Sequence, residues 1–137
     1  MNYWLVKSEP DVYSYDQLVA EGRGRWDGVR NYQARNNLRA MKEGDLCFFY
    51  HSNIGLAVVA ITKVVREHYP DPTAEKGYWS CVELEPVKAL NRAVTLAEIK
   101  AEPALQQILL VRNGRLSVMP LTSDEFSTIL AMGDTQL

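Results

Sequence analysis

Leu46–Val65, which reads LCFFYHSNIGLAVVAITKVV, contains two apolar runs of strand length with a short polar stretch between them. The first run is Leu46–His51, and the second, Leu56–Val65, is rich in Val and Ile. Trp79–Val87 then alternates between apolar and polar side chains, as an antiparallel strand with one buried face does. The whole block from Leu46 to Val87 is therefore predicted to be β structure, which argues against an alternating βαβ chain.

The chain before this block is predicted to form one strand and two helices. Tyr3–Lys7 has the alternation of a strand. Ser14-x-x-Gln17 is the pattern of a capping box and predicts a short helix, which two glycines then interrupt. Asn31 is a favourable cap for a second helix over about Tyr32–Met41.

Helices are also predicted after the β block. Thr95-x-x-Glu98 indicates the start of a short helix, and Pro103 is well placed to open the next one. Leu116–Met119 is predicted to be a brief strand, and Thr122-x-x-Glu125 to cap a final helix. We therefore expect one α+β domain over residues 1–137, with a curved, mostly antiparallel sheet or small open barrel flanked by helices.

Composition excludes several classes of protein. No apolar run approaches the ~20 residues that span a membrane, and the amino terminus lacks the features of a signal peptide, so we expect a cytoplasmic protein without membrane contacts. Cys47 and Cys81 lie in apolar runs and are predicted to be buried thiols rather than a disulfide. Neither forms a metal-ligand pattern with His51 or His68, so no metal and no cofactor are expected.

The charge of the chain is unevenly distributed. The net charge is −2, but residues 22–42 carry six cations and one carboxylate. Gly22–Arg25 is interpreted as a flexible basic loop. Arg35 and Arg39 are one helical turn apart and share a face. The cluster is either a solvated face or a basic patch beside a site for an anionic partner, in which Arg35 and Arg39 would contact phosphates.

Three separated stretches combine aromatic and hydrogen-bonding residues: Trp4–Pro10, Trp26–Asn31 and Phe48–Ser52. A flipped or single-stranded base needs flat walls to stack on, and fixed donors and acceptors for its edge. Trp26 is predicted to lie in a loop, where burial in a core is harder to arrange. The chain has no nucleophile-elbow, phosphate-binding-loop or dinucleotide-binding motif.

The stretch WDGVRNYQARN at Trp26–Asn36 closely resembles the EVE domain family, as do Trp4–Pro10, Phe49–Ser52, Tyr69–Pro72 and Arg115–Val118. That family belongs to the PUA-like superfamily and is related to the YTH domain, a reader of methylated adenine in RNA. The resemblance implies a PUA-like barrel with a pocket for a modified base, and modified cytosine in DNA is the ligand usually proposed for the family.

The resemblance also implies roles for individual residues. Lys7 and Ser8 match a Lys-Ser pair at the floor of the pocket, and Trp26 matches the tryptophan that stacks on the base. The remaining ligand-binding positions that match are Arg30 and Asn31 beside that tryptophan, Tyr50, His51 and Ser52 at a strand end, and Arg115 and Ser117 in the segment that closes the pocket. We expect Ser8 to contact the edge of the base.

Other functions stay open at this point. The ligand can be a modified base in RNA or a free nucleotide instead of DNA. An enzyme acting on modified nucleotides would draw acid–base groups from Lys7, Glu9, Asp27 and His51. A protein-interaction module with an incidental pocket would show a large exposed apolar patch. No pattern indicates an oligomeric state.

Overall fold

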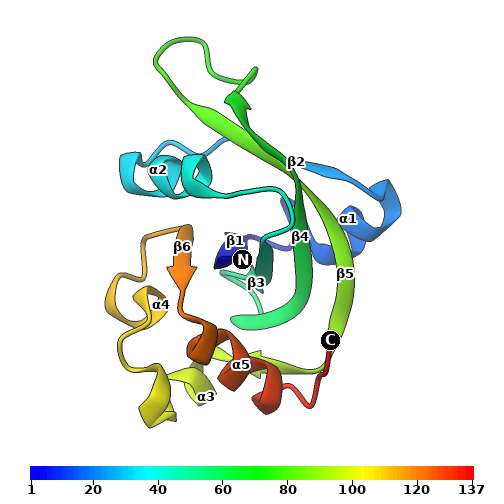
Figure 1. Cartoon of the computed structure of the whole chain (residues 1–137), viewed down its shortest axis with the longest axis vertical. Coiled ribbons are helices and arrows are strands. Elements are labelled where there is room, and N and C mark those ends of the chain that lie inside the picture. The colour runs from blue at the N-terminus through cyan, green and yellow to red at the C-terminus, as the bar shows by residue number, and fades with distance from the viewer.

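A computed structural model describes all 137 residues and shows a single six-stranded sheet with helices around it (Figure 1). The strands lie in the order β2-β5-β4-β3-β1-β6. They are β1 (Tyr3–Ser8), β2 (Gly24–Trp26), β3 (Leu46–His51), β4 (Ala57–Pro70), β5 (Ser80–Thr95) and β6 (Val118–Leu121). Only β1 and β3 run parallel, so the predicted α+β fold with a mostly antiparallel, open sheet is confirmed.

With the exception of α4, the helices begin where the sequence patterns predict. They are α1 (Tyr15–Glu21), α2 (Tyr32–Ala40), α3 (Leu96–Ala101), the 3-10 helix η1 (Pro103–Leu105), α4 (Leu109–Arg112) and α5 (Ser123–Met132). Complete capping boxes form at Ser14, Thr95 and Thr122, and the Asn31 side chain accepts a hydrogen bond from the Ala34 backbone to cap α2. The four-residue helix α4 was not predicted.

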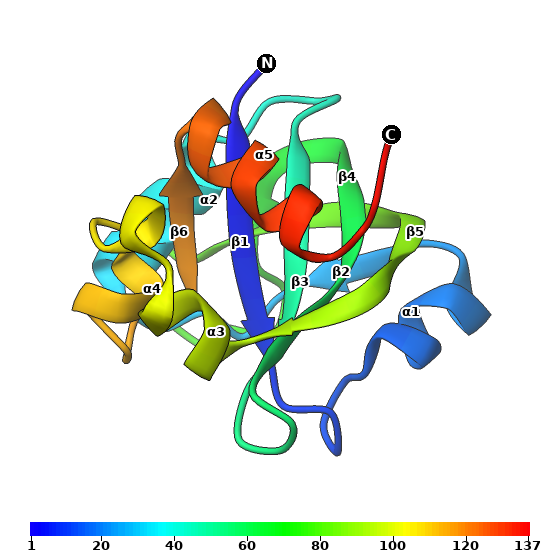
Figure 2. The same ribbon diagram turned by 90° about the horizontal axis from the view of Figure 1, so that it is seen from below.

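The long strands β4 and β5 bend around the molecule (Figures 1 and 2). Their pairing shifts register at four places, and a further irregularity lies between β3 and β4 at Phe49/Tyr50. Bulges of this kind leave one residue unpaired and increase the local bend and twist. The sheet can therefore curve around its own core without closing into a barrel.

Several strands differ from the sequence predictions; β6, for example, covers Val118–Leu121 where Leu116–Met119 was expected. β4 continues beyond the predicted end at Val65 to Pro70, because Tyr69 and Pro70 still pair with β5. β5 continues beyond Val87 to Thr95, because its second half pairs with the first residues of β4. β2 was missed, since three residues carry no periodic pattern and are held in extended form only by their pairing with β5.

Consecutive side chains of β3 point to opposite faces of the sheet and help build the core on both sides. Phe48 stacks on Phe126 of α5 with ring centroids 4.3 Å apart, and α5 lies across β1 and β3 (Figure 2). Phe49 instead contacts Trp26 edge to face on the other side.

Cys47 and Cys81 are buried free thiols, as predicted. None of the helices has the length and hydrophobicity of a membrane-spanning segment.

Candidate functional site

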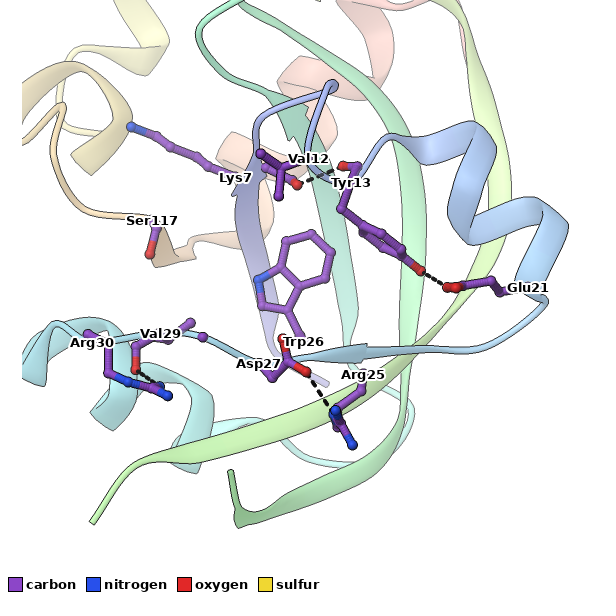
Figure 3. A pocket seen from close by; sticks show the side chains of 12 residues that line it. Lys7, Val12, Tyr13, Glu21, Arg25, Trp26, Asp27, Val29, Arg30 and Ser117 are labelled. Atoms are coloured by element: carbon purple, nitrogen blue, oxygen red, sulfur yellow. Dashed lines mark hydrogen bonds and ion pairs between the residues drawn. The ribbon is translucent and has the colours of Figure 1, made fainter. Parts of the chain in front are cut away.

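A cavity of about 580 Å³ lies where the ends of β1 and β2 meet the segment before β6; we call it the Trp26 pocket. It is lined by Lys7, Ser8, Val12, Tyr13, Glu21, Arg25, Trp26, Asp27, Gly28, Val29, Arg30 and Ser117. Figure 3 shows the Trp26 indole in the middle of this cavity, with Ser117 on one side and Tyr13 on the other. The structure thus brings together Lys7, Ser8, Trp26, Arg30 and Ser117 from the predicted site.

Trp26 is the central residue of the pocket, but its setting differs from the prediction. It lies at the end of β2, paired with Val82 of β5, rather than in a loop. Its side chain is 7% exposed and meets Phe49 and Tyr13 edge to face, with centroids 5.3 and 6.1 Å away. The indole is therefore both a core residue and a wall of the pocket, and it is held rigidly by its aromatic neighbours.

Lys7 and Ser8 end β1 and fix the loops on either side of the pocket. Lys7 Nζ donates a hydrogen bond to the Gly114 carbonyl at 2.8 Å, and the Lys7 backbone N–H donates to the Ser117 carbonyl at 2.9 Å. Burial lowers the pKa of Lys7. The Ser8 hydroxyl donates to the Tyr13 carbonyl at 2.6 Å. Both side chains thus have structural partners, although the Ser8 oxygen keeps lone pairs that can accept a further hydrogen bond.

Two pairs of charged and polar side chains border the pocket. The Tyr13 hydroxyl donates to Glu21, and Arg25 Nε lies 2.7 Å from Asp27 Oδ2 (Figure 3). Burial, together with the neighbouring Glu21 carboxylate, raises the pKa of Tyr13, so this residue stays a neutral phenol at physiological pH. The carboxylates at the pocket are therefore partnered within the protein.

Asp71 organises Asp27–Arg30, a segment that lines the pocket and that we call the rim loop. Its carboxylate accepts hydrogen bonds from the backbone N–H of Gly28 at 2.8 Å and from Arg30 at 3.0 Å. Two further bonds come from the backbone and hydroxyl of Thr73. Burial alone would raise the pKa of Asp71, but these four donors outweigh it and lower the pKa to about 2. In the sequence, Asp71 was indicated only by its place in Tyr69–Pro72, one of the segments that resemble the EVE domain family.

Some residues predicted to bind ligand do not line the pocket. The Asn31 side chain is occupied as the cap of α2, because its oxygen accepts from Ala34. Tyr50 is almost fully buried in β3, where its ring lies 5.8 Å from Lys7 Nζ. Arg115 is exposed near Ser117 and outside the lining set. Asn31 and Tyr50 are therefore engaged within the protein, in the cap of α2 and in the core, and do not border the cavity.

His51 and Ser52 are also outside the pocket lining. His51 Nε2 accepts a hydrogen bond from the Tyr15 backbone N–H at 3.2 Å, and burial lowers the pKa of this histidine. The Ser52 backbone N–H donates to the Ser8 carbonyl at 2.9 Å. These residues hold the end of β1 and the start of α1 in place, and His51 is not positioned for acid–base chemistry in the pocket.

Arg35 and Arg39 face the loop between β4 and β5 and are not part of the pocket lining. Both donate to the Tyr78 carbonyl, at 3.1 and 2.7 Å, and Arg39 also donates to Ser80. Neither guanidinium lies within ion-pair distance of a carboxylate. Their positive charge is therefore not neutralised locally.

The lining residues that were not among the predicted ligand-binding positions are Val12, Tyr13, Glu21, Arg25, Asp27, Gly28 and Val29, of which Asp27 was named only as an acid–base group for an enzyme. Four of them, Arg25 and Asp27–Val29, lie within three residues of Trp26, so β2 and the segment after it bring them to the pocket with the indole. The others come from α1 and the loop before it, whose place beside the pocket depends on tertiary packing.

Comparisons with known proteins agree with this architecture. Residues 2–132 match the EVE domain family. Thymocyte nuclear protein 1 of Mus musculus is 40% identical over 98% of this chain and 75% of its own length. The crystal structure of a protein from Agrobacterium tumefaciens is 47% identical, with a TM-score of 0.96 over 98% of this chain and 94% of that one. Human THYN1 in complex with 5-methylcytosine-containing DNA is 35% identical, with a TM-score of 0.91 over 100% of both chains.

A more distant likeness concerns the fold alone. The YTH domain of the Zygosaccharomyces rouxii MRB1 protein, solved in complex with N6-methyladenosine RNA, has a TM-score of 0.61 at 13% identity. The superposition covers 99% of this chain and 88% of that domain. The predicted structural relationship to YTH domains is confirmed.

Proposed function

The chain belongs to the EVE domain family, and from this membership and the Trp26 pocket we propose that it is a non-catalytic reader of a modified base in nucleic acid. We further propose that the base is a modified cytosine in DNA. The human THYN1 complex with 5-methylcytosine-containing DNA supports this choice, because the THYN1 chain in that structure shares this fold throughout.

The observation that carries the proposal is the meeting of Ser8, Trp26 and Ser117 around one cavity. Its volume of about 580 Å³ falls within the range of about 300–1,000 Å³ typical of small-molecule sites. An aromatic wall and two hydroxyl-bearing side chains supply the stacking surface and the edge contacts that a base requires. A base in a duplex reaches such a pocket only by rotating out of the stack.

Binding without catalysis is supported by the partners of the ionisable groups. Lys7 is bonded to the Gly114 carbonyl, Glu21 to Tyr13, and Asp27 to Arg25. His51 lies outside the pocket, and its Nε2 already accepts a hydrogen bond. A general base must be within hydrogen-bond reach of the proton that it removes, and each of these groups is held toward another part of the protein.

The direct test is a fluorescence-polarisation titration with oligonucleotides that differ in one base. A duplex with a single 5-methylcytosine is compared with its unmodified counterpart, with the same strands unpaired, and with RNA and free nucleotides of the same modification. We expect the modified DNA to bind most tightly. Equal affinity for modified and unmodified DNA would contradict the proposal.

A second measurement addresses catalysis. The modified oligonucleotide is incubated with protein, digested and analysed by mass spectrometry. We expect the modified base to be recovered unchanged. Multiple turnovers to a new product would instead favour an enzyme acting on modified nucleotides.

A further inference from the structure

The loop between β4 and β5 presents an aromatic side chain to solvent beside the Trp26 pocket. Tyr78 is 86% exposed, the most exposed large apolar side chain of the molecule. Figure 1 shows this loop projecting beyond the rest of the fold, on the side where α2 lies. A single exposed tyrosine is unremarkable by itself. Tyr78 differs from other exposed apolar residues in that arginines hold its backbone and its neighbour Trp79 contacts a residue of the pocket.

Two arginines hold the backbone of Tyr78. Arg35 and Arg39, one turn apart on α2, both donate to the Tyr78 carbonyl. Arg39 also donates to the Ser80 hydroxyl at 2.8 Å, which fixes the loop two residues further on. The Tyr78 side chain therefore projects from a backbone that is already ordered. Its binding to a partner costs less conformational entropy than binding through a flexible loop would.

The residue after Tyr78 connects this loop to the pocket. The Arg30 guanidinium lies 5.7 Å from the Trp79 ring centroid, and Arg30 also lines the Trp26 pocket. The Trp79 carbonyl accepts from the Asp71 backbone N–H at 2.9 Å, while the Asp71 side chain binds Gly28 of the rim loop. A short series of direct contacts thus joins the base of the Tyr78 loop to the edge of the pocket.

The surface around Tyr78 is aromatic and cationic. Tyr32, on the first turn of α2, stacks on Trp79 with centroids 5.1 Å apart, and the Arg35 guanidinium lies 4.9 Å from the Tyr32 centroid. Arg35 and Arg39 have no carboxylate partner. Charges of this sign complement a phosphate backbone, so the observations favour nucleic acid over a protein as the occupant of this surface.

From these contacts we propose that the surface formed by α2 and the β4–β5 loop receives duplex nucleic acid, and that the Tyr78 side chain enters the base stack where the modified base has left it. This inference rests on the proposed function, since a gap arises only when a base is rotated into the Trp26 pocket. Side chains that insert between base steps offset the stacking lost when a base leaves the duplex. Arg35 and Arg39 would then face the phosphates that flank the gap.

The test compares Tyr78→Ala and Tyr78→Phe with the wild-type protein on two forms of one ligand. One is a duplex with a single 5-methylcytosine, and the other is the same modified strand unpaired. Only the duplex has a gap to fill. We expect Tyr78→Ala to weaken duplex binding by about tenfold, the effect of one stacked ring, and to leave single-strand binding within about twofold. Tyr78→Phe keeps the ring and should behave as the wild type does.

A matched control is Val87→Ala, which removes an exposed apolar side chain from β5 without touching this surface. Unchanged duplex affinity in Tyr78→Ala overturns the inference, provided that the wild type still prefers the modified base. Equal weakening on duplex and single strand also overturns it, because Tyr78 would then contact a flanking base and not a gap. A wild type without any preference for the modified base refutes the proposed function itself.

Discussion

The carboxylate of Asp71 accepts a hydrogen bond from the backbone N–H of Gly28 at 2.8 Å, across 43 residues of sequence. Gly28 has a φ of +77°, a left-handed conformation that glycine adopts without strain. The bond fixes the rim loop directly after Trp26, and it does so from the loop that carries Tyr78. Asp71 is therefore the point at which the pocket and the adjacent surface are joined.

Asp71→Asn is predicted to destabilise the fold and weaken binding together. The amide replaces one acceptor oxygen with a donor that faces Gly28, Arg30 or Thr73. A buried donor left without a partner costs about 1–3 kcal/mol, and we expect a loss of that size in the free energy of unfolding. Urea denaturation and the polarisation titration measure the two effects. Glu75→Gln removes the same charge from the same loop and should change neither.

A pH titration of stability provides an independent test of Asp71. Its pKa is about 2 in the folded protein, below its ordinary value of 3.8. Between pH 2 and pH 3.8 the unfolded state therefore binds more protons at Asp71 than the folded state does. The stabilisation of the fold by the Asp71 carboxylate is present above pH 3.8 and is lost as the pH falls toward 2. Glu83 behaves similarly, because hydrogen bonds from Tyr69 and Arg23 lower its pKa to about 2.

We expect the free energy of unfolding to fall less steeply from pH 5 to pH 2, about the range in which these groups titrate, in Asp71→Asn than in the wild type. Glu83→Gln should show a reduction of the same sign. An identical pH dependence in wild type and Asp71→Asn would mean that the Asp71 carboxylate is not specifically stabilised in the native state.

The fold was predictable from local signals where those signals are strong. The capping residues Ser14, Thr95 and Thr122 each satisfy backbone donors at a helix start, so they identify helices without tertiary information. β2 was not predictable in this way. Its residues Gly24–Trp26 are extended because β5 supplies their hydrogen-bond partners, and nothing in the three residues themselves requires a strand.

The site was predictable only where side chains enter the pocket from a recognisable motif. Lys7, Ser8 and Trp26 line it, as the resemblance implied. Asn31 and His51 belong to the same motifs, yet the structure uses them to cap α2 and to accept the Tyr15 amide. A motif identifies a neighbourhood in the fold, and which of its side chains faces the cavity depends on the strand pleat and on tertiary packing.

Substitution of Trp26 is predicted to affect both stability and binding. The indole packs against Phe49 and Tyr13, so Trp26→Ala should lower the free energy of unfolding by about 3–5 kcal/mol. Trp26→Phe retains an aromatic ring and should remain folded, while its smaller face weakens binding of the modified oligonucleotide. Thermal unfolding and polarisation separate the two effects. Full affinity in a folded Trp26→Phe protein would mean that the indole face is not a contact surface.

Salt dependence tests the predicted phosphate contacts of Arg35 and Arg39. Each contact adds roughly −0.7 to −0.9 to the slope of log affinity against log salt concentration. Arg39 uses its Nε and one terminal nitrogen within the protein, which leaves the other free for a phosphate. We expect Arg39→Gln to reduce the magnitude of the slope by about one such contact. Arg112→Gln, on the short helix α4, is the control, and an unchanged slope in Arg39→Gln would exclude the contact.

Ser8 is predicted to distinguish between bases through the acceptor lone pairs of its hydroxyl oxygen. Its hydroxyl donates to the Tyr13 carbonyl at 2.6 Å, so its proton is already used, and the oxygen can act toward a ligand only as an acceptor. Cytosine carries an amino group at C4, a donor, where thymine carries an acceptor oxygen. A pocket in which Ser8 faces this edge should therefore prefer 5-methylcytosine to thymine, although both bases carry the same methyl group.

Two duplexes that differ only by 5-methylcytosine or thymine at one position test this directly, each opposite an abasic site so that pairing does not contribute. Ser8→Ala removes the acceptor and should reduce the preference by about fivefold, which corresponds to about 1 kcal/mol for one hydrogen bond. Ser8→Ala also frees the Tyr13 carbonyl, but any loosening of the loop affects both duplexes and cancels in their ratio. Ser8→Thr keeps the hydroxyl and should keep the preference. If the ratio of affinities for the 5-methylcytosine and thymine duplexes is unchanged in Ser8→Ala, the amino group of the base lies elsewhere in the pocket. Ser117 is then the next candidate acceptor.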